Sequence, residues 1–175
     1  MARANQSINV RLTTLNDVTE INNIIIKTYP GIAGYPRDTI KAQLNHFPEG
    51  QFVVEFNGVV VGFCMTFIIS EKFAAVPHTW KEITGSGMAS RHDPLGDYLY
   101  GMEICVDSAF RGKKIGERLY NERKKLCQNL GLAGIIFGAR IPGYTKRKKV
   151  YKTPEEYLEA VSSRQVKDPT VSFQI

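Results

Sequence analysis

The dipeptide Asn57-Gly58 is the feature that most narrows the fold of this 175-residue chain. It joins two β-rich runs, Gln51 to Phe56 and Val59 to Ile69. Asn-Gly most readily supplies the two positive φ angles of a type I′ turn, so the two runs are predicted to pair as an antiparallel hairpin. A fold that contains this segment must therefore include an antiparallel sheet.

The remaining apolar patterns predict further strands and the helices that cover them. Alternation predicts a strand at Ile8 to Leu12, and β-rich runs predict strands at Tyr98 to Val106 and Ile135 to Ala139. Caps and helical periodicity predict helices from Thr14 to about Pro30, over Ile40 to Phe47, from Arg111 to Leu130 and from Thr153 to Val161. The order β-α-α-β-β-β-α-β-α favours an α/β (α+β) fold with a mixed, mostly antiparallel sheet between helices.

Composition and length predict one folded domain over residues 1–175. The chain is 43% hydrophobic and 23% charged, which is typical of globular proteins and excludes disordered, collagen-like and coiled-coil classes. The longest apolar run is much shorter than the roughly 20 residues that cross a bilayer, and the first ten residues have no hydrophobic centre. We therefore expect a cytoplasmic protein without a membrane partner.

Cysteine and histidine spacing predicts neither a disulfide framework nor a metal site. The three cysteines, Cys64, Cys105 and Cys127, are widely spaced within apolar or helical stretches and are expected to be reduced and partly buried. The three histidines have no metal-ligand spacing.

Positive charge is concentrated after residue 110. Residues 1–110 carry 8 Lys and Arg against 11 Asp and Glu, whereas residues 111–175 carry 15 against 6. A polyanion or a phosphorylated small molecule would be attracted to this last third. Aromatic residues do not alternate with the basic ones, so nucleic acid is the less favoured partner. The run Lys146 to Lys149 can equally be a solvated patch.

A strand that runs directly into a basic helix start is the segment with the clearest chemistry. It reads Glu103-Ile-Cys-Val-Asp-Ser-Ala-Phe-Arg111-Gly-Lys-Lys-Ile-Gly116. The first backbone N–H groups of a helix lack intrahelical partners, and the aligned peptide dipoles make that end positive. Gly112 and Gly116 permit close approach to the backbone, and Arg111, Lys113 and Lys114 add charge, so the segment predicts a phosphate-binding site.

This segment resembles the acyl-CoA pyrophosphate loop of the GNAT N-acetyltransferase superfamily. The resemblance lies in the pattern V-D-x-x-F-R-G-x-x-I-G, which follows a strand and precedes an amphipathic helix. The resemblance covers essentially the whole chain, because that family has the element order predicted above. The phrases FPEGQF, HTWKEITG, HDPLGDYLYG and GARIPGY are also similar to GNAT domains fused ahead of a nitrilase-like amidohydrolase.

The resemblance implies acetyl-CoA as co-substrate and assigns its binding residues. The pyrophosphate would be held by the loop and helix start, and the fourth and fifth strands would splay so that free strand backbone pairs with the pantetheine arm. The implied strand residues are Ile104, Cys105 and Val106, and the implied loop residues are Arg111, Gly112, Lys113, Lys114, Ile115 and Gly116.

Two catalytic roles follow from the same resemblance. Glu103 would take a proton from the substrate ammonium, because an amine attacks a thioester only when neutral. The alternative for Glu103 is a strand carboxylate paired with a nearby cation. Many relatives protonate the leaving thiolate with a tyrosine of the final helix, where this chain has Phe173, so Tyr144 is the candidate acid or else a loop aromatic packed on the sheet edge.

The sequence departs from the family pattern at two places. Lys114 stands where the loop usually has the first glycine of R-x-x-G-x-G, which predicts a weaker or shifted pyrophosphate site. The family also closes with two strands after the last helix, whereas this sequence stops at Ile175. We therefore expect a fragment of a longer protein; an open sheet edge also makes a homodimer a candidate assembly.

Three function classes stay open at this stage. The first is an acetyl-CoA-dependent N-acyltransferase that acetylates a small-molecule or peptide amine. The second is a non-catalytic acyl-CoA-binding module that regulates an attached hydrolase domain, and the third is a nucleic-acid binder. The segment Glu71 to Asp97 is predicted as a long loop, in which Trp80, with Phe73 and Tyr98, either lines an acceptor pocket or packs the loop.

Overall fold

The computed structural model describes residues 7–29 and 31–173. The chain forms two compact units, residues 1–137 and residues 138–175. Within the described residues, every helix is too short or too polar to cross a bilayer.

The first unit contains a five-stranded sheet in which the strands follow their order in the sequence, β1-β2-β3-β4-β5. The first four strands pair antiparallel, and β4 and β5 pair in parallel. The strands are β1 (Ile8–Leu12), β2 (Gln51–Phe56), β3 (Val59–Ile69), β4 (Tyr98–Val106) and β5 (Gly134–Phe137). This mixed, mostly antiparallel sheet confirms the predicted fold class.

The predicted hairpin between β2 and β3 is confirmed. Asn57 and Gly58 both have positive φ, 52° and 82°, as a type I′ turn requires. Asparagine tolerates this conformation and glycine adopts it without strain, which explains why this pair, rather than two ordinary residues, closes the hairpin.

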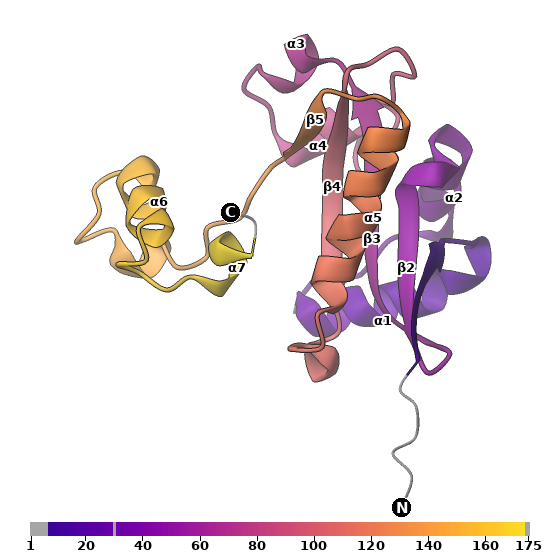
Figure 1. The fold of residues 1–175 in the computed structure, drawn as a ribbon, viewed down its shortest axis with the longest axis horizontal. Coiled ribbons are helices and arrows are strands. Elements are labelled where there is room, and N and C mark those ends of the chain that lie inside the picture. The colour runs from indigo at the N-terminus through magenta and orange to yellow at the C-terminus, as the bar shows by residue number, and fades with distance from the viewer. Residues whose placement is uncertain (1–6, 30, 174–175) are drawn as a thin grey trace, which may run out of the picture. The chain divides into compact units, whose positions relative to one another are not determined.

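Helices cover both faces of the sheet (Figure 1). The helices α1 (Val18–Thr28) and α2 (Arg37–His46) pack on one face, and the long helix α5 (Ile115–Asn129) packs on the other. The larger core joins α1, α2 and the inward residues of β3 and β4, and a smaller core joins Ile115 and Leu119 of α5 to β2 and β3. Three short 3₁₀ turns complete the frame: Leu15–Asp17, Pro48–Gly50 and Ser108–Phe110.

Two predictions about this unit need correction. The segment predicted as a loop contains two short helices, α3 (Glu71–Ala74) and α4 (Trp80–Thr84). A capping box explains α4, because the Thr79 hydroxyl accepts from the Glu82 N–H and the Glu82 carboxylate accepts from the Thr79 N–H. The helix predicted from Arg111 begins at Ile115, because residues 111–114 form a turn.

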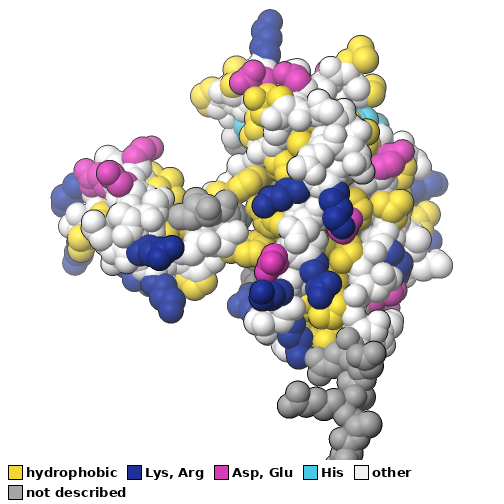
Figure 2. Space-filling model, viewed as in Figure 1, with side chains coloured by type: hydrophobic (Ala, Val, Ile, Leu, Met, Phe, Trp, Pro, Cys, Tyr) yellow, Lys and Arg dark blue, Asp and Glu magenta, His cyan; other side chains and the backbone are white. Residues whose placement is uncertain are grey.

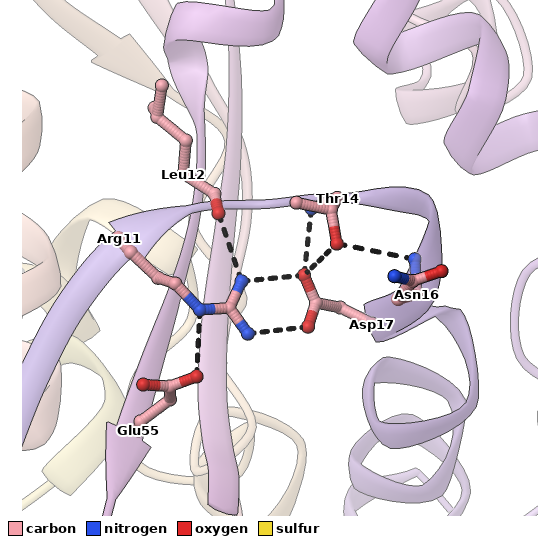
Figure 3. A network of polar contacts seen from close by, with 6 residues as sticks. All are labelled: Arg11, Leu12, Thr14, Asn16, Asp17 and Glu55. Atoms are coloured by element: carbon pink, nitrogen blue, oxygen red, sulfur yellow. Dashed lines mark hydrogen bonds and ion pairs between the residues drawn. The ribbon is translucent and has the colours of Figure 1, made fainter. Parts of the chain in front are cut away.

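A partly buried ion pair fixes the start of α1 to the sheet (Figure 3). The Arg11 guanidinium donates to both carboxylate oxygens of Asp17, at 2.7 and 2.8 Å, and to Glu55 at 2.7 Å. Asp17 also accepts from the Thr14 N–H and hydroxyl. Burial by itself would raise the pKa of Asp17, but the bonds from Arg11 and Thr14 outweigh it and hold that pKa below its usual value.

We expect Asp17→Asn to lower the free energy of unfolding by about 2 kcal/mol at neutral pH, because it breaks charge-assisted bonds to a buried oxygen pair. A carboxyl whose pKa is depressed in the folded state stabilises it above the unfolded pKa and loses that contribution as the pH falls through the folded value. The difference between wild type and Asp17→Asn in urea unfolding should therefore shrink below about pH 4. A difference that stays constant down to pH 2 would contradict this account.

The second unit is a small helical cluster around Asp168. It contains a 3₁₀ turn (Thr145–Arg147), α6 (Pro154–Ser162) and α7 (Pro169–Ser172). The predicted N-cap of α6 is confirmed, since the Thr153 side chain accepts from the Glu156 N–H. The Asp168 carboxylate accepts from the Tyr157 hydroxyl at 2.7 Å and from the Gly143 N–H at 3.1 Å. This buried carboxylate therefore ties the loop after β5 to both helices.

Candidate functional site

Only the first half of β4 is paired with β5. The register runs from Tyr98 opposite Gly134 to Gly101 opposite Phe137, where β5 ends. Among the described residues, Ile104–Val106 have no strand partner on that side, although they pair with β3 on the other. This open stretch contains Ile104, Cys105 and Val106, the residues implied for pantetheine. Burial raises the pKa of the Cys105 thiol to about 11, so this cysteine stays protonated and unreactive near neutral pH.

The turn after β4 is fixed to α1. The Asp107 side chain accepts from the Ala109 N–H at 3.0 Å, which caps the 3₁₀ turn Ser108–Phe110. Lys27 of α1 forms an ion pair with the other Asp107 oxygen at 2.9 Å. This bond from Lys27, together with the Ala109 N–H, holds the pKa of Asp107 below its usual value. The start of the predicted phosphate loop is therefore attached to the helix layer beneath it.

The predicted phosphate loop opens onto an uncapped helix. Within the described residues, no side chain accepts a hydrogen bond at the start of α5, so the N–H groups of its first turn are available. Gly112 has φ +78°, and a Cβ built on it would meet no atom within 4 Å. Arg111, Lys113 and Lys114 are exposed. Lysine and arginine side chains gather over the face that α5 covers (Figure 2).

Lys114 adopts the backbone conformation that glycine would adopt. Its φ and ψ are 58° and 23°, in the left-handed region, immediately before the first residue of α5. A non-glycine residue pays a steric cost there. The turn thus keeps a glycine-like path despite the substitution that set this sequence apart from the R-x-x-G-x-G pattern.

We expect Lys114→Gly to raise the free energy of unfolding by about 1 kcal/mol, because glycine adopts positive φ without the Cβ clash. Urea unfolding at fixed ionic strength measures the change. Lys114→Ala is the matched control, since it removes the same charge and keeps the strained conformation. Equal stabilisation by alanine and glycine would assign the effect to the lost charge instead of to the backbone.

Glu103 lies beside an aromatic pair at the head of the open stretch. The Tyr35 hydroxyl donates a hydrogen bond to the Glu103 carboxylate. The Tyr35 ring stacks on Trp80, with centroids 6.4 Å apart and planes 19° apart. Burial first, and then the charge and hydrogen bond of Glu103, raise the pKa of Tyr35 above its usual value. This hydroxyl therefore stays protonated and acts as a donor to the carboxylate across the working pH range.

The backbone of Tyr35 is itself held in place by α1. The Asn22 amide donates to the Tyr35 carbonyl at 2.9 Å and accepts from the Tyr35 N–H at 2.7 Å. The loop between α1 and α2 thus presents a fixed hydroxyl to β4. Tyr35 could not be predicted from the sequence, because nothing in the residues around it indicates which strand this loop faces.

The other predicted residues lie in different surroundings. Phe73 lies under the Arg91 guanidinium, 5.5 Å from ring centroid to Cζ, whereas Trp80 packs on Tyr35. Tyr144 belongs to the second unit, where its hydroxyl donates to the Lys152 carbonyl at 3.1 Å and its ring packs on Tyr157. Its role as an acid stays a prediction.

The three cysteines are free and buried, as predicted, and the described residues contain no group of three His, Cys, Asp or Glu that could hold a metal ion.

The comparisons with known proteins agree with this geometry. The model of the Acetyltransferase (GNAT) family matches residues 18–152 of the chain. The chain belongs to this family. The resemblance predicted from the strand, the basic loop and the following helix is therefore confirmed for family and fold.

Two curated proteins and a solved structure resemble this GNAT chain. The probable hydrolase YhcX of Bacillus subtilis (strain 168) is 37% identical over 175 residues; the match covers all of this chain, which spans 34% of the length of YhcX. The uncharacterized N-acetyltransferase YkwB of the same organism is 27% identical over 174 residues, covering 96% of this chain and 76% of YkwB. The GphF GNAT-like decarboxylase, solved in complex with isobutyryl-CoA, superposes with a TM-score of 0.76 at 20% identity, covering 94% of this chain and 82% of that one.

Proposed function

We propose that this GNAT chain transfers an acetyl group from acetyl-CoA to an amine, with Glu103 as the general base. The observation that carries the proposal is the continuous path from an open strand edge to an uncapped helix: among the described residues, Ile104–Val106 of β4 have no strand partner on the β5 side, and β4 leads through the turn 107–114 into α5. An extended arm with a diphosphate at its far end suits such a path, since strand backbone and helix N–H groups supply successive donors.

The first turn of α5 and the basic loop before it would hold the diphosphate. The N–H groups of Ile115 and Gly116 and the backbone at Gly112 supply donors, and Arg111, Lys113 and Lys114 supply charge. The backbone of Ile104, Cys105 and Val106 would pair with the pantetheine arm. GphF binds isobutyryl-CoA, which supports an acyl-CoA as the ligand of this fold.

Glu103 would accept the proton that the amine must lose. The amine nitrogen attacks the thioester carbonyl carbon, a C–N bond forms, the C–S bond breaks, and the departing sulfur takes a proton to become the CoA thiol. The hydroxyl of Tyr35 keeps the Glu103 carboxylate oriented until the amine arrives. Tyr144 as the donor to sulfur is part of the proposal, with solvent as the alternative donor.

The acceptor is proposed to be an amine of a small molecule or peptide. YkwB is named as an N-acetyltransferase, which supports transfer to nitrogen. The name and greater length of YhcX support a parent protein in which such a chain is joined to a hydrolase domain. The proposed location is the cytoplasm. The regulatory acyl-CoA-binding module is the competing proposal.

The proposal is tested by measuring binding and turnover on the same sample. We expect calorimetry to show saturable binding of acetyl-CoA, and a thiol-release assay against a panel of amines to show turnover. Desulfo-CoA should also bind, because the diphosphate and the arm supply most of the contacts. Good binding with no thiol release from any amine would favour the regulatory module, and no heat at millimolar acetyl-CoA would exclude both.

A further inference from the structure

A bulge in β4 decides which face of the sheet carries Glu103. The register between β3 and β4 shifts by one residue at this point, because Glu103 pairs with Met65 and Gly101 pairs with Thr66, which leaves Met102 as the extra residue. Met102 packs in the core on the α1 side, and Glu103 reaches Tyr35 on that same side. Neighbouring strand residues share a face only where an extra residue is inserted.

The residues on either side of the bulge confirm this reversal. Ile104 packs with Ile115 and Leu119 of α5 on the opposite face. A Cβ built on Gly101 would also point to α5, where it would lie 3.3 Å from Nη1 of Arg123. Without the extra residue, the side chains in one half of β4 would point to the opposite face of the sheet. Glu103 would then no longer share a face with Met102.

Side chains from both faces donate to the carbonyl groups at the bulge. From α5, Nη2 of Arg123 donates to the Met65 carbonyl at 3.1 Å and to the Glu103 carbonyl. From α4, Nε1 of Trp80 donates to the Met102 carbonyl at 3.2 Å. A bulge disrupts the regular ladder, so these donors satisfy backbone oxygens that would otherwise be costly to bury.

Arg123 is a costly residue to place between a helix and a sheet. It is 1% exposed, although a guanidinium is a charged group with five N–H donors and no acceptor. For packing alone, an apolar side chain at this position of α5 would avoid the desolvation cost of the charge. What the guanidinium supplies, and an apolar residue cannot, is donation to the Met65 and Glu103 carbonyls. Gly101, which lacks a side chain, leaves the room that Arg123 occupies.

We propose that Arg123 and Trp80 are positioning residues that fix the β4 bulge from the two faces of the sheet and thereby hold Glu103 against Tyr35. This inference rests on the proposed role of Glu103 as the base. Arg123 acts through the carbonyl of Glu103 itself, and Trp80 acts through the neighbouring Met102.

The inference is tested by measuring turnover and acetyl-CoA binding separately. In Arg123→Met, turnover per acetyl-CoA binding site, counted by calorimetry, should fall by about tenfold or more, while the Kd for acetyl-CoA changes less than about threefold. Arg123→Lys should retain more turnover than Arg123→Met, because an ammonium can still donate to the carbonyls. Trp80→Phe, which keeps an aromatic ring but removes the N–H together with part of the indole, should also lower turnover per site. The matched control is Arg118→Met, an exposed arginine of the same helix.

A second measurement does not depend on activity. Trp80 is the only tryptophan, so the protein gives one indole N–H signal in a ¹H–¹⁵N spectrum. Arg123→Met and Arg123→Lys should move this signal, because the bulge carbonyl that Trp80 contacts shifts, and Arg118→Met should not. A wild type that binds acetyl-CoA and acetylates nothing would refute the proposed function, and the indole signal would still decide the positioning role. An unmoved signal in both Arg123 variants, or turnover per site within about twofold of wild type in Arg123→Met, would overturn the inference.

Discussion

Replacing Glu103 by glutamine is expected to lower the rate of acetyl transfer by about 10² or more, the range that a positioned general base contributes. Glutamine has nearly the same shape and still accepts a hydrogen bond from Tyr35, but it cannot take a proton from the attacking amine. Because the cradle at residues 111–116 is untouched, the affinity for acetyl-CoA should change less than about threefold. Thiol release and calorimetry on one preparation measure the two quantities.

Two matched variants locate the effect. Glu55→Gln removes a carboxylate from β2, which β3 separates from β4, and should leave transfer unchanged. Tyr35→Phe removes only the hydroxyl that orients Glu103 and should cost less than Glu103→Gln. If Glu103→Gln turns over at the wild-type rate, Glu103 has no part in proton transfer and is instead a strand carboxylate held by Tyr35.

Local chemistry predicted those parts of the fold that depend on neighbouring residues. Asn57-Gly58 specifies its turn by two φ angles, and Thr153 caps α6 with its own hydroxyl, so both features follow from a few adjacent residues. The capping box of Thr79 and Glu82 was equally visible in the sequence. Three glycines and two prolines in Glu71 to Asp97 obscured it, which is why α4 was predicted as loop.

The features of the site that the sequence did not reveal all depend on register. Arg123 occupies a helix whose apolar stripe predicts only packing, and its carbonyl partners exist because β4 gains one residue against β3. No local pattern marks Met102 as that extra residue. Tyr35 likewise acquires its role through a contact 68 positions away along the chain. The family resemblance supplied Glu103, and the three-dimensional contacts supply the groups that orient it.

The largest expected effect on binding comes from Gly112→Ala. Gly112 has φ +78° near the start of the cradle at residues 111–116. Alanine in this left-handed conformation costs about 1 kcal/mol of conformational free energy, and its methyl group would face open space. The turn must then either keep a strained path or rotate its N–H groups away from the diphosphate. In both cases we expect the Kd for acetyl-CoA to rise by about tenfold or more, which corresponds to about 1.4 kcal/mol.

The opposite end of α5 provides the control for strain. Gly131 also has positive φ, +64°, and a Cβ built on it would likewise meet no atom within 4 Å. At about 1.5 Å per residue, the 15 residues of α5 separate the two ends by about 20 Å. Gly131→Ala should therefore lower the free energy of unfolding by a similar amount and leave the Kd unchanged.

Comparing these two variants separates stability from recognition. Both lose stability through the same left-handed backbone, so a loss of affinity in Gly112→Ala alone must come from the cradle. An equal loss of affinity in both would mean that α5 responds as a whole to destabilisation, and the diphosphate would then have to be sought elsewhere. Unchanged affinity in both would show that the backbone around Gly112 does not contact the ligand.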